Sequence, residues 1–296
     1  MNAFNSSVRR FGRGGVALQA RAGEALSFEQ MSQFAPTVFA DIAHSSRSER
    51  FQVIPTHDLL GGLAKEGFVP VRVQVGGSRD EEKRSFTKHM IRFRRQDDLA
   101  GLPKVGDSHP EVVLMNAHDG TSSYQLHAGL FRLVCTNGLT VSDASFGQVK
   151  VGHSGKGVLD KVIEGTYRVL DDAVLALGRA QELQTVTVDR DEQRIFGEAA
   201  LRLRYDDETL PSINGTEVVR ARRSADAYCS LWHTFNRAQE NLIRGGLNYR
   251  HTNEEGRVSF RETRAVNGAD GDLKLNRALW HLTQEFAKLK GQPVAA

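Results

Sequence analysis

The chain has 296 residues, with 39 Lys and Arg against 36 Asp and Glu, so its formal net charge is only +3. Its 40% hydrophobic and 25% charged residues are ordinary for a folded protein, and its length can bury one large core or two modest ones. A chain-wide polyelectrolyte is excluded, so any binding of nucleic acid must come from local clusters of charge.

Cysteine usage and hydropathy indicate the compartment. Cys135 and Cys229 are far apart and neither belongs to a CxxC motif, which argues against a disulfide framework or a Cys-rich zinc site and fits a reducing cytoplasm. No apolar run approaches the roughly 18 to 20 residues that span a bilayer, and Val16–Leu18 is too short for a signal-peptide core. We therefore expect a cytoplasmic protein with no membrane partner.

The first predicted elements are an arm and two helices. Residues 1–26 are rich in Gly, Ser and Arg and lack periodicity, which predicts a flexible basic arm. Ser27 is expected to cap a short helix that stops before Pro36. Thr56 is expected to cap a second helix, closed by Gly67. Together these features predict a mobile N-terminus followed by short helical segments.

A strand-rich block follows the second helix. Residues 68–75 alternate and end in a Gly-Gly turn, so with residues 86–95 they predict an antiparallel hairpin. Val112–Met115 is apolar on both faces, the pattern of a central, covered strand. Further strands are predicted at 124–127, 130–135 and 146–151.

The second half of the chain has a helical period. From Val158 to Leu177 the apolar residues fall three and four apart, which predicts one long helix. Further helices are predicted around 195–203, 225–243 and 273–286, with a polar segment at 248–272 before the last. A strand block followed by helices predicts an α+β fold with an antiparallel, strand-rich N-terminal half and a mostly helical C-terminal half.

This order of elements also predicts the domain organisation. We expect a flexible basic arm at 1–26 and a strand-rich α+β domain with its long helix at 27–185. A helical region is expected at 186–296, either separate or packed on the first domain as one unit.

The most informative stretch for function is a basic strand at 85–95. Read with a period of two, Lys88, Arg92 and Arg94 fall on one face together with Phe86, and Arg95 closes the run. A row of cations beside an aromatic side chain suits the phosphates and bases of a single strand. The alternative is a half-exposed strand whose basic face is merely solvated and partnered by the acids at 80–82.

Two further cations open the last predicted helix. Lys274 and Arg277 are three residues apart and share a helix face near its N-terminus, where free amides also favour phosphate. Alternatively they pair with Asp270 and Asp272, the acids expected in a first helical turn. Both interpretations stay open from the residues alone.

A candidate metal site follows the central strand. Asn116, His118 and Asp119, with His127 nearby, offer nitrogen and oxygen ligands for a divalent metal. A nuclease needs two or more convergent carboxylates, so Glu111 or Asp143 would have to join Asp119 in the fold. The alternative is turn chemistry, in which Asp and Ser side chains bond to nearby amides. No other cofactor is expected.

Six phrases occur together along the chain: Ser46–Phe51, Thr87–Met90, Asn116–Tyr124, Arg132–Leu139, Gln239–Gly246 and Asp272–Trp280. In this order they resemble a family of plasmid- and prophage-encoded proteins catalogued as domain of unknown function 932. The resemblance covers roughly residues 27 to 289. It implies a mobile-element setting in bacterial cytoplasm and brings no activity or catalytic residue.

These observations lead to one function hypothesis and two rivals. The strand block and long helix resemble, in pattern only, the core of phage single-strand annealing proteins. We expect a non-enzymatic, homo-oligomeric protein that binds or anneals single-stranded nucleic acid. The first rival is a metal-dependent nuclease centred on Asn116, His118 and Asp119. The second is a protein that inhibits a host defence protein.

Overall fold

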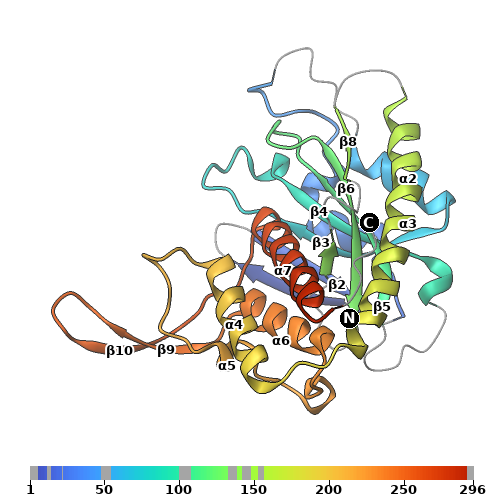
Figure 1. The fold of residues 1–296 in the computed structure, drawn as a ribbon. Coiled ribbons are helices and arrows are strands. Elements are labelled where there is room, and N and C mark those ends of the chain that lie inside the picture. Colours follow the sequence, from blue (N-terminus) through green and yellow to red (C-terminus); the bar gives the residue numbers. More distant parts are fainter. Residues whose placement is uncertain are drawn as a thin grey trace. The chain divides into compact units, whose positions relative to one another are not determined.

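The computed structural model describes residues 6–11, 15–21, 23–47, 55–99, 108–132, 139–141, 148–152 and 157–291. The fold is α+β, with a strand-rich N-terminal half and a mostly helical C-terminal half, which confirms the predicted class (Figure 1). The chain divides into two compact units. The first takes residues 1–133, 140–176 and 267–269, and the second takes 134–139, 177–266 and 270–296.

An eight-stranded sheet organises the first unit, with strand order β1-β2-β3-β4-β5-β6-β7 and with β8 also paired to β6. The strands are β1 (Ser6–Phe11), β2 (Gly15–Ala20), β3 (Phe68–Val75), β4 (His89–Arg95), β5 (Ser108–Asn116), β6 (Tyr124–Arg132), β7 (Leu139–Val141) and β8 (Val149–Val151). The pairs from β1 to β6 are antiparallel. The predicted hairpin of β3 and β4 and the central position of β5 are therefore confirmed.

The first two strands differ from the flexible arm that the sequence predicted. Residues 6–11 and 15–20 form a hairpin whose second strand pairs with β3. The reason is the alternation of Val16, Leu18 and Ala20, which directs apolar side chains to the covered face; Leu18 is fully buried. The Gly, Ser and Arg content around them concealed this short apolar stripe.

One row of apolar side chains crosses the sheet and fixes its register. Leu18, Val73, Ile91, Leu114 and Leu126 are successive cross-strand partners from β2 to β6, and all five are fully buried. A slip of one residue in any strand would turn its member of the row to the opposite face.

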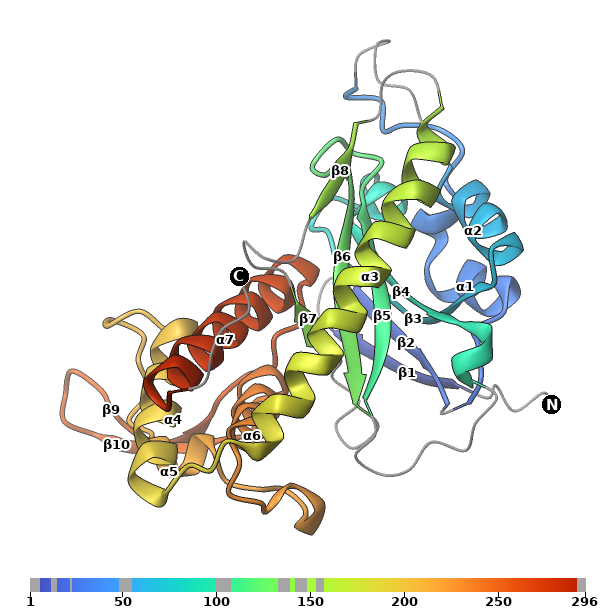
Figure 2. The same cartoon turned by 45° about the vertical axis from the view of Figure 1, so that its right-hand side comes forward.

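Helices cover the face that carries this row (Figure 2). They are α1 (Phe28–Phe34), a 3₁₀ helix (Pro36–Phe39), α2 (Thr56–Lys65) and the first part of α3 (Val158–Thr185). Ser27 caps α1 as predicted, because its Oγ accepts from the Gln30 amide and the Gln30 side chain accepts from the Ser27 amide. Thr56 does not cap α2: Pro55 is the cap residue, and the Thr56 hydroxyl is engaged elsewhere.

The second unit is built from helices and one hairpin. Its elements are α4 (Arg190–Arg204), α5 (Gly215–Val218), α6 (Leu231–Arg244), β9 (Asn248–Thr252), β10 (Val258–Glu262) and α7 (Ala269–Leu289). The rings of Trp232 and Phe235 stack at 5.5 Å and Trp280 meets Phe235 edge-on, so the stripe on α6 is core, as predicted. Among the described residues no helix is long and apolar enough to cross a membrane.

Candidate nucleic-acid interface

The two arginines at the centre of the predicted basic strand are buried. Arg92 is 1% exposed and Arg94 is 6% exposed, on the sheet face opposite Ile91. Both bind the same carboxylate: Arg92 Nη1 lies 3.2 Å from Glu111 Oε2, and Arg94 Nε lies 2.7 Å from Glu111 Oε1. Glu111 is itself fully buried. The expected outward-facing row of cations is therefore wrong for these two residues, because β4 is central in the sheet and covered on both faces.

The remaining members of the predicted basic strand are half-buried. Phe86 lies in a 3₁₀ turn before β4 and meets the His44 ring edge-on at 5.5 Å. The Arg95 guanidinium lies 5.5 Å from the centre of the Phe68 ring. Lys88 precedes β4 and is half-buried. These side chains do not form a continuous exposed stripe with Arg92 and Arg94.

The alternative interpretation, a solvated basic face partnered by the acids at 80–82, is also wrong for Arg92 and Arg94, because these acids pair with cations of their own turn. Lys83 lies 3.8 Å from Asp80, and Arg84 lies 2.9 Å from Glu81. Exposed pairs of this kind contribute little to stability, about 0 to 1 kcal/mol. They do balance the charge of the turn that leads into β4.

Lys274 and Arg277 lie in α7, in the second unit. Lys274 is exposed and Arg277 is half-buried. Asp272 is buried, and its carboxylate accepts a hydrogen bond of 2.9 Å from Asn276 Nδ2. Phosphate binding by this pair stays a prediction.

The candidate metal residues divide between two settings. Asn116 ends β5 and His118 follows it, and both side chains are fully buried. Asp119 is more exposed, and its Oδ1 accepts from the Thr121 amide at 3.0 Å and from the Thr121 hydroxyl at 2.6 Å. This is the turn chemistry that the sequence offered as the alternative. Among the described residues, no group of three His, Cys, Asp or Glu side chains converges on a metal position.

Asn116 and His118 belong to a buried polar network centred on the Thr56 hydroxyl. Thr56 Oγ1 lies 3.1 Å from Asn116 Nδ2, 3.0 Å from His89 Nε2 and 3.3 Å from His118 Nε2. Tyr124 completes the network, and burial raises the pKa of its hydroxyl well above the ordinary value. All five side chains are fully buried. The network is closed to solvent, so its geometry fits a structural role in joining α2 to β4, β5 and β6.

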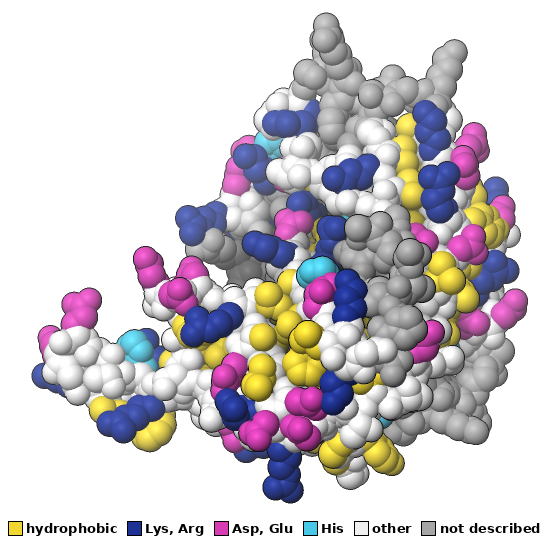
Figure 3. All heavy atoms as spheres, in the orientation of Figure 1, with side chains coloured by type: hydrophobic (Ala, Val, Ile, Leu, Met, Phe, Trp, Pro, Cys, Tyr) yellow, Lys and Arg dark blue, Asp and Glu magenta, His cyan; other side chains and the backbone are white. Residues whose placement is uncertain are grey.

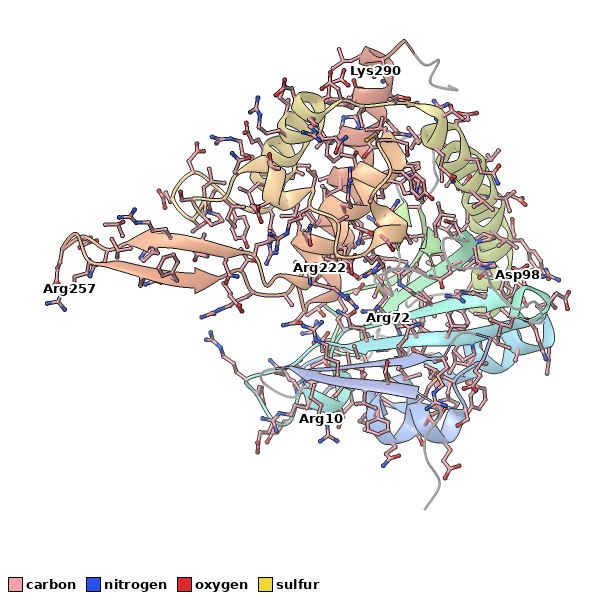
Figure 4. All side chains as sticks on the ribbon, turned by 90° about the horizontal axis from the view of Figure 1, so that it is seen from below. Arg10, Arg72, Asp98, Arg222, Arg257 and Lys290 are labelled. Atoms are coloured by element: carbon pink, nitrogen blue, oxygen red, sulfur yellow. The ribbon has the colours of Figure 1, made fainter. Side chains whose placement is uncertain are left out.

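The second unit carries a feature that the sequence analysis missed. Strands β9 and β10 form a two-stranded hairpin that extends away from the helices of its own unit (Figures 1 and 4), and Arg257 lies at its tip. All of β10 and alternate residues of β9 are exposed. The turn is closed by Asn253, whose amide donates to the Arg257 carbonyl at 3.0 Å and whose Oδ1 accepts from the Arg257 amide at 2.7 Å.

The register of the hairpin sorts its side chains onto two faces. On one, hereafter the Arg250–Phe260 face, Arg250 is directly opposite Phe260 and Thr252 is opposite Val258. Phe260 is 83% exposed and Val258 is 46% exposed. Phe260 and Val258 therefore form an exposed apolar pair on this face of the hairpin.

The other side, the Tyr249–Arg261 face, has Tyr249 opposite Arg261 and His251 opposite Ser259. A cavity of about 560 Å³ lies between β9 and the loop at 208–212, and residues of both faces line it, Arg250 and Thr252 as well as Tyr249, His251 and Arg261. Among the described residues neither Arg250 nor Arg261 has an ion-pair partner, and both are exposed. The hairpin thus offers one available guanidinium on each face.

Backbone contacts hold the base of the hairpin on the end of α6. The Gly246 amide donates to the Thr263 carbonyl at 2.8 Å, and the Thr263 amide donates to the Leu247 carbonyl at 2.9 Å. Gly245 has φ +69°, and a Cβ added there would lie 2.4 Å from the Thr263 carbonyl oxygen. Only glycine satisfies both the conformation and the space at this position.

A sequence signal for the hairpin exists but is weak. Tyr249 and His251 alternate in the first strand, Val258 and Phe260 alternate in the second, and the turn between them contains Gly256. Because most of the side chains are polar, the segment has no apolar stripe, and its pattern predicts a polar connection between helices.

Comparisons with known proteins place the chain among relatives without a stated activity. Residues 43–280 match the family described as "Domain of unknown function (DUF932)". Two proteins of Escherichia coli (strain K12), UPF0380 protein YfjQ and UPF0380 protein YafZ, are each 41% identical to it over 277 residues, which is 94% of this chain and 97% of each relative. No solved structure matches the chain significantly.

Proposed function

This chain belongs to the DUF932 family, as its motifs indicated, and we propose that it binds single-stranded nucleic acid without catalysing a reaction on it. The observation that supports the proposal is the Arg250–Phe260 face, where a guanidinium lies directly opposite an exposed aromatic ring. A guanidinium binds phosphate and a ring stacks on an unpaired base, so the pair offers both contacts that a single strand requires. Bases within a duplex are already stacked, which favours single strands.

The hairpin is a better candidate than β4 because its cations are available. Binding phosphate through Arg92 or Arg94 would require breaking their pairs with Glu111 inside the sheet. Arg250 and Arg261 are exposed and lose only water when they contact phosphate. Within the strands of the hairpin, these two arginines outnumber the single acid, Glu262.

The rival nuclease site receives no support from the geometry. His118 is fully buried, and the Asp119 carboxylate is bound by Thr121. A phosphodiester cannot reach His118 without displacing the segments packed over it. The remaining rival, inhibition of a host protein, becomes an outcome of the experiment that follows.

The test measures the affinity of the full chain for labelled oligothymidylate by fluorescence anisotropy across a salt series. For Arg250→Ala with Arg261→Ala, we expect weaker binding and a salt slope that is less steep by up to about 0.7 for each lost phosphate contact. For Phe260→Ala, we expect a loss of about 1–3 kcal/mol, roughly 5- to 150-fold in affinity, with an unchanged salt slope. Phe260→Trp is expected to retain binding.

A matched control is Arg190→Ala with Arg220→Ala, two exposed arginines of the same unit, of which Arg220 pairs with Glu217 at 3.2 Å. It removes two positive charges outside the hairpin and should leave the slope unchanged. Wild-type affinity in both the double arginine variant and Phe260→Ala would refute the assignment to the hairpin. A wild-type chain that ignores every oligonucleotide but holds a host protein through Phe260 would support the inhibitor instead.

A further inference from the structure

A groove in the first unit lies between the edge strand β8 and helix α3. Its lining comes from both elements: Val149, Lys150, Val151 and Gly152 on one side, and Lys161, Glu164, Gly165 and Arg168 on the other. The cavity measures about 280 Å³. Figure 3 shows Lys and Arg side chains gathered over the part of the surface where β8 and α3 lie.

The floor of the groove is rigidly packed. A Cβ added at Gly165 would lie 2.7 Å from Val149 Cγ1 and 2.8 Å from Leu126 Cδ1, so the helix backbone lies close against β6 and β8. Leu126 is fully buried and pairs with Val149 in the sheet. The separation of helix and strand is therefore set by core contacts, which fixes the backbone positions from which the rim side chains extend.

The rim carries an excess of positive charge. Lys150, Lys161 and Arg168 face a single acid, Glu164, whose carboxylate lies 3.7 Å from Arg168 Nη2 in an exposed pair. In the part of the chain that the structure describes, neither Lys150 nor Lys161 has an ion-pair partner. Two of the three cations are thus available to a ligand.

The edge of β8 adds a second kind of donor. In the described sheet β8 pairs only with β6, so its other edge has no strand bonded to it. Backbone amides at such an edge donate to phosphate oxygens as readily as to carbonyls. Lys161 and Arg168 are seven residues apart, about 10 Å along one side of α3, so they contact different phosphates of an extended strand.

We propose that the β8–α3 groove binds the phosphodiester backbone of the nucleic acid, as a second contact surface in addition to the hairpin. This inference rests on the proposed function and adds a site in the other compact unit. The groove supplies phosphate contacts only, because no aromatic side chain lines it. It therefore contributes affinity and salt dependence without preference for a base.

The experiment compares two double variants of the full chain in the same anisotropy assay. For Lys150→Ala with Lys161→Ala, we expect weaker binding and a salt slope less steep by up to about 1.4, which is two contacts at about 0.7 each. The matched control is Lys65→Ala with Lys83→Ala, two lysines of the same unit outside the groove. It removes the same charge and should leave the slope at the wild-type value.

The outcomes separate this inference from the proposed function. A wild-type slope in the groove variant, together with weakened hairpin variants, overturns the groove and leaves the function standing. Absence of binding by the wild type overturns both. Inorganic phosphate at constant ionic strength distinguishes the source of the phosphate: binding of phosphate that is lost in the groove variant, while the salt slope with oligonucleotide stays at the wild-type value, would assign the groove to free phosphate instead.

Discussion

Strand β4 and the β9–β10 hairpin both combine arginines with phenylalanine, yet these side chains are buried in β4 and exposed in the hairpin. In β4, Arg92 is 1% exposed beside Phe93, which is also 1% exposed. In the hairpin, Arg250 is exposed opposite Phe260, which is 83% exposed. The difference comes from the place of each strand in its sheet. A central strand buries both faces, whereas a ribbon of two strands has no core to bury them in.

Burial also decides whether an arginine requires a carboxylate partner to compensate its charge. A buried cation costs several kcal/mol unless a carboxylate and further hydrogen bonds compensate it, which explains the fully buried Glu111 between Arg92 and Arg94. The exposed arginines of the hairpin need no such partner. Arg92 and Arg94 therefore contribute to the packing of the sheet, whereas the arginines of the hairpin remain available for a ligand.

The largest expected effect is a loss of stability when the buried carboxylate of Glu111 is neutralised. Glu111→Gln removes the charge that Arg92 and Arg94 share, and we expect the free energy of unfolding to fall by about 3–5 kcal/mol. Urea denaturation followed by circular dichroism measures the loss. Arg250→Ala should change the same quantity by no more than about 0.5 kcal/mol, as an exposed residue without a partner. Equal effects from the two substitutions would contradict the distinction between the regions.

A smaller loss of stability is expected from glycine substitutions in the exposed hairpin, and it should be larger at the base than at the tip. Gly245→Ala places a Cβ 2.4 Å from the Thr263 carbonyl oxygen at φ +69°. Gly256→Ala at the tip has a similar φ of +76° and open space around it. We expect Gly256→Ala to cost about 1–2 kcal/mol for the left-handed conformation alone, and Gly245→Ala to cost more.

Hydrogen exchange of residues 248–262 is the second measurement on this glycine pair. Because Gly245 holds the base of the hairpin, its substitution should speed exchange along β9 and β10, and the Gly256 substitution should affect the turn alone. Identical unfolding energies and exchange patterns in the two variants would show that the contact with Thr263 is unimportant.

The smallest expected effect concerns the buried network and appears at alkaline pH. Burial raises the pKa of Tyr124 above the ordinary value of about 10, so the folded chain keeps a proton that the unfolded chain loses. Stability from this group is complete below pH about 10 and declines as the pH rises further. Tyr124→Phe should lose about 1 kcal/mol at neutral pH and decline less steeply above pH 10 in urea denaturation. A decline as steep as that of wild type would argue against this role.

Local signals in the sequence were enough for several elements. Ser27 can accept a hydrogen bond from the Gln30 amide, and the Gln30 side chain can accept one from the Ser27 amide. This local capping pattern marks the start of α1. The run Val112–Met115, which is apolar on both faces, lies in the interior strand β5 between β4 and β6. The three- and four-residue spacing from Val158 became α3. Each depends on neighbours within a few residues along the chain.

The candidate site depended on tertiary partners and was harder to predict. Arg92 and Arg94 are buried because Glu111, 19 and 17 residues away, lies on the adjacent strand. Nothing local distinguishes them from arginines on a solvated strand. Conversely, the sequence around Phe260 is polar and gives no sign that its ring is exposed. The pairing of β9 with β10 alone places Phe260 on a two-stranded ribbon, where its side chain is 83% exposed.

The Thr37 hydroxyl, in the 3₁₀ helix before α2, sets the tautomer of His89 in the buried network. Thr37 gives its own proton to the Thr87 carbonyl, so His89 Nδ1, 3.3 Å from Thr37 Oγ1, must carry hydrogen and leave Nε2 as an acceptor. The Thr56 hydroxyl, 3.0 Å from His89 Nε2, is therefore the donor in that contact, and Asn116 Nδ2 donates to Thr56 Oγ1 at 3.1 Å. A side chain of the 3₁₀ helix thereby determines which ring nitrogen of His89 accepts a hydrogen bond from α2.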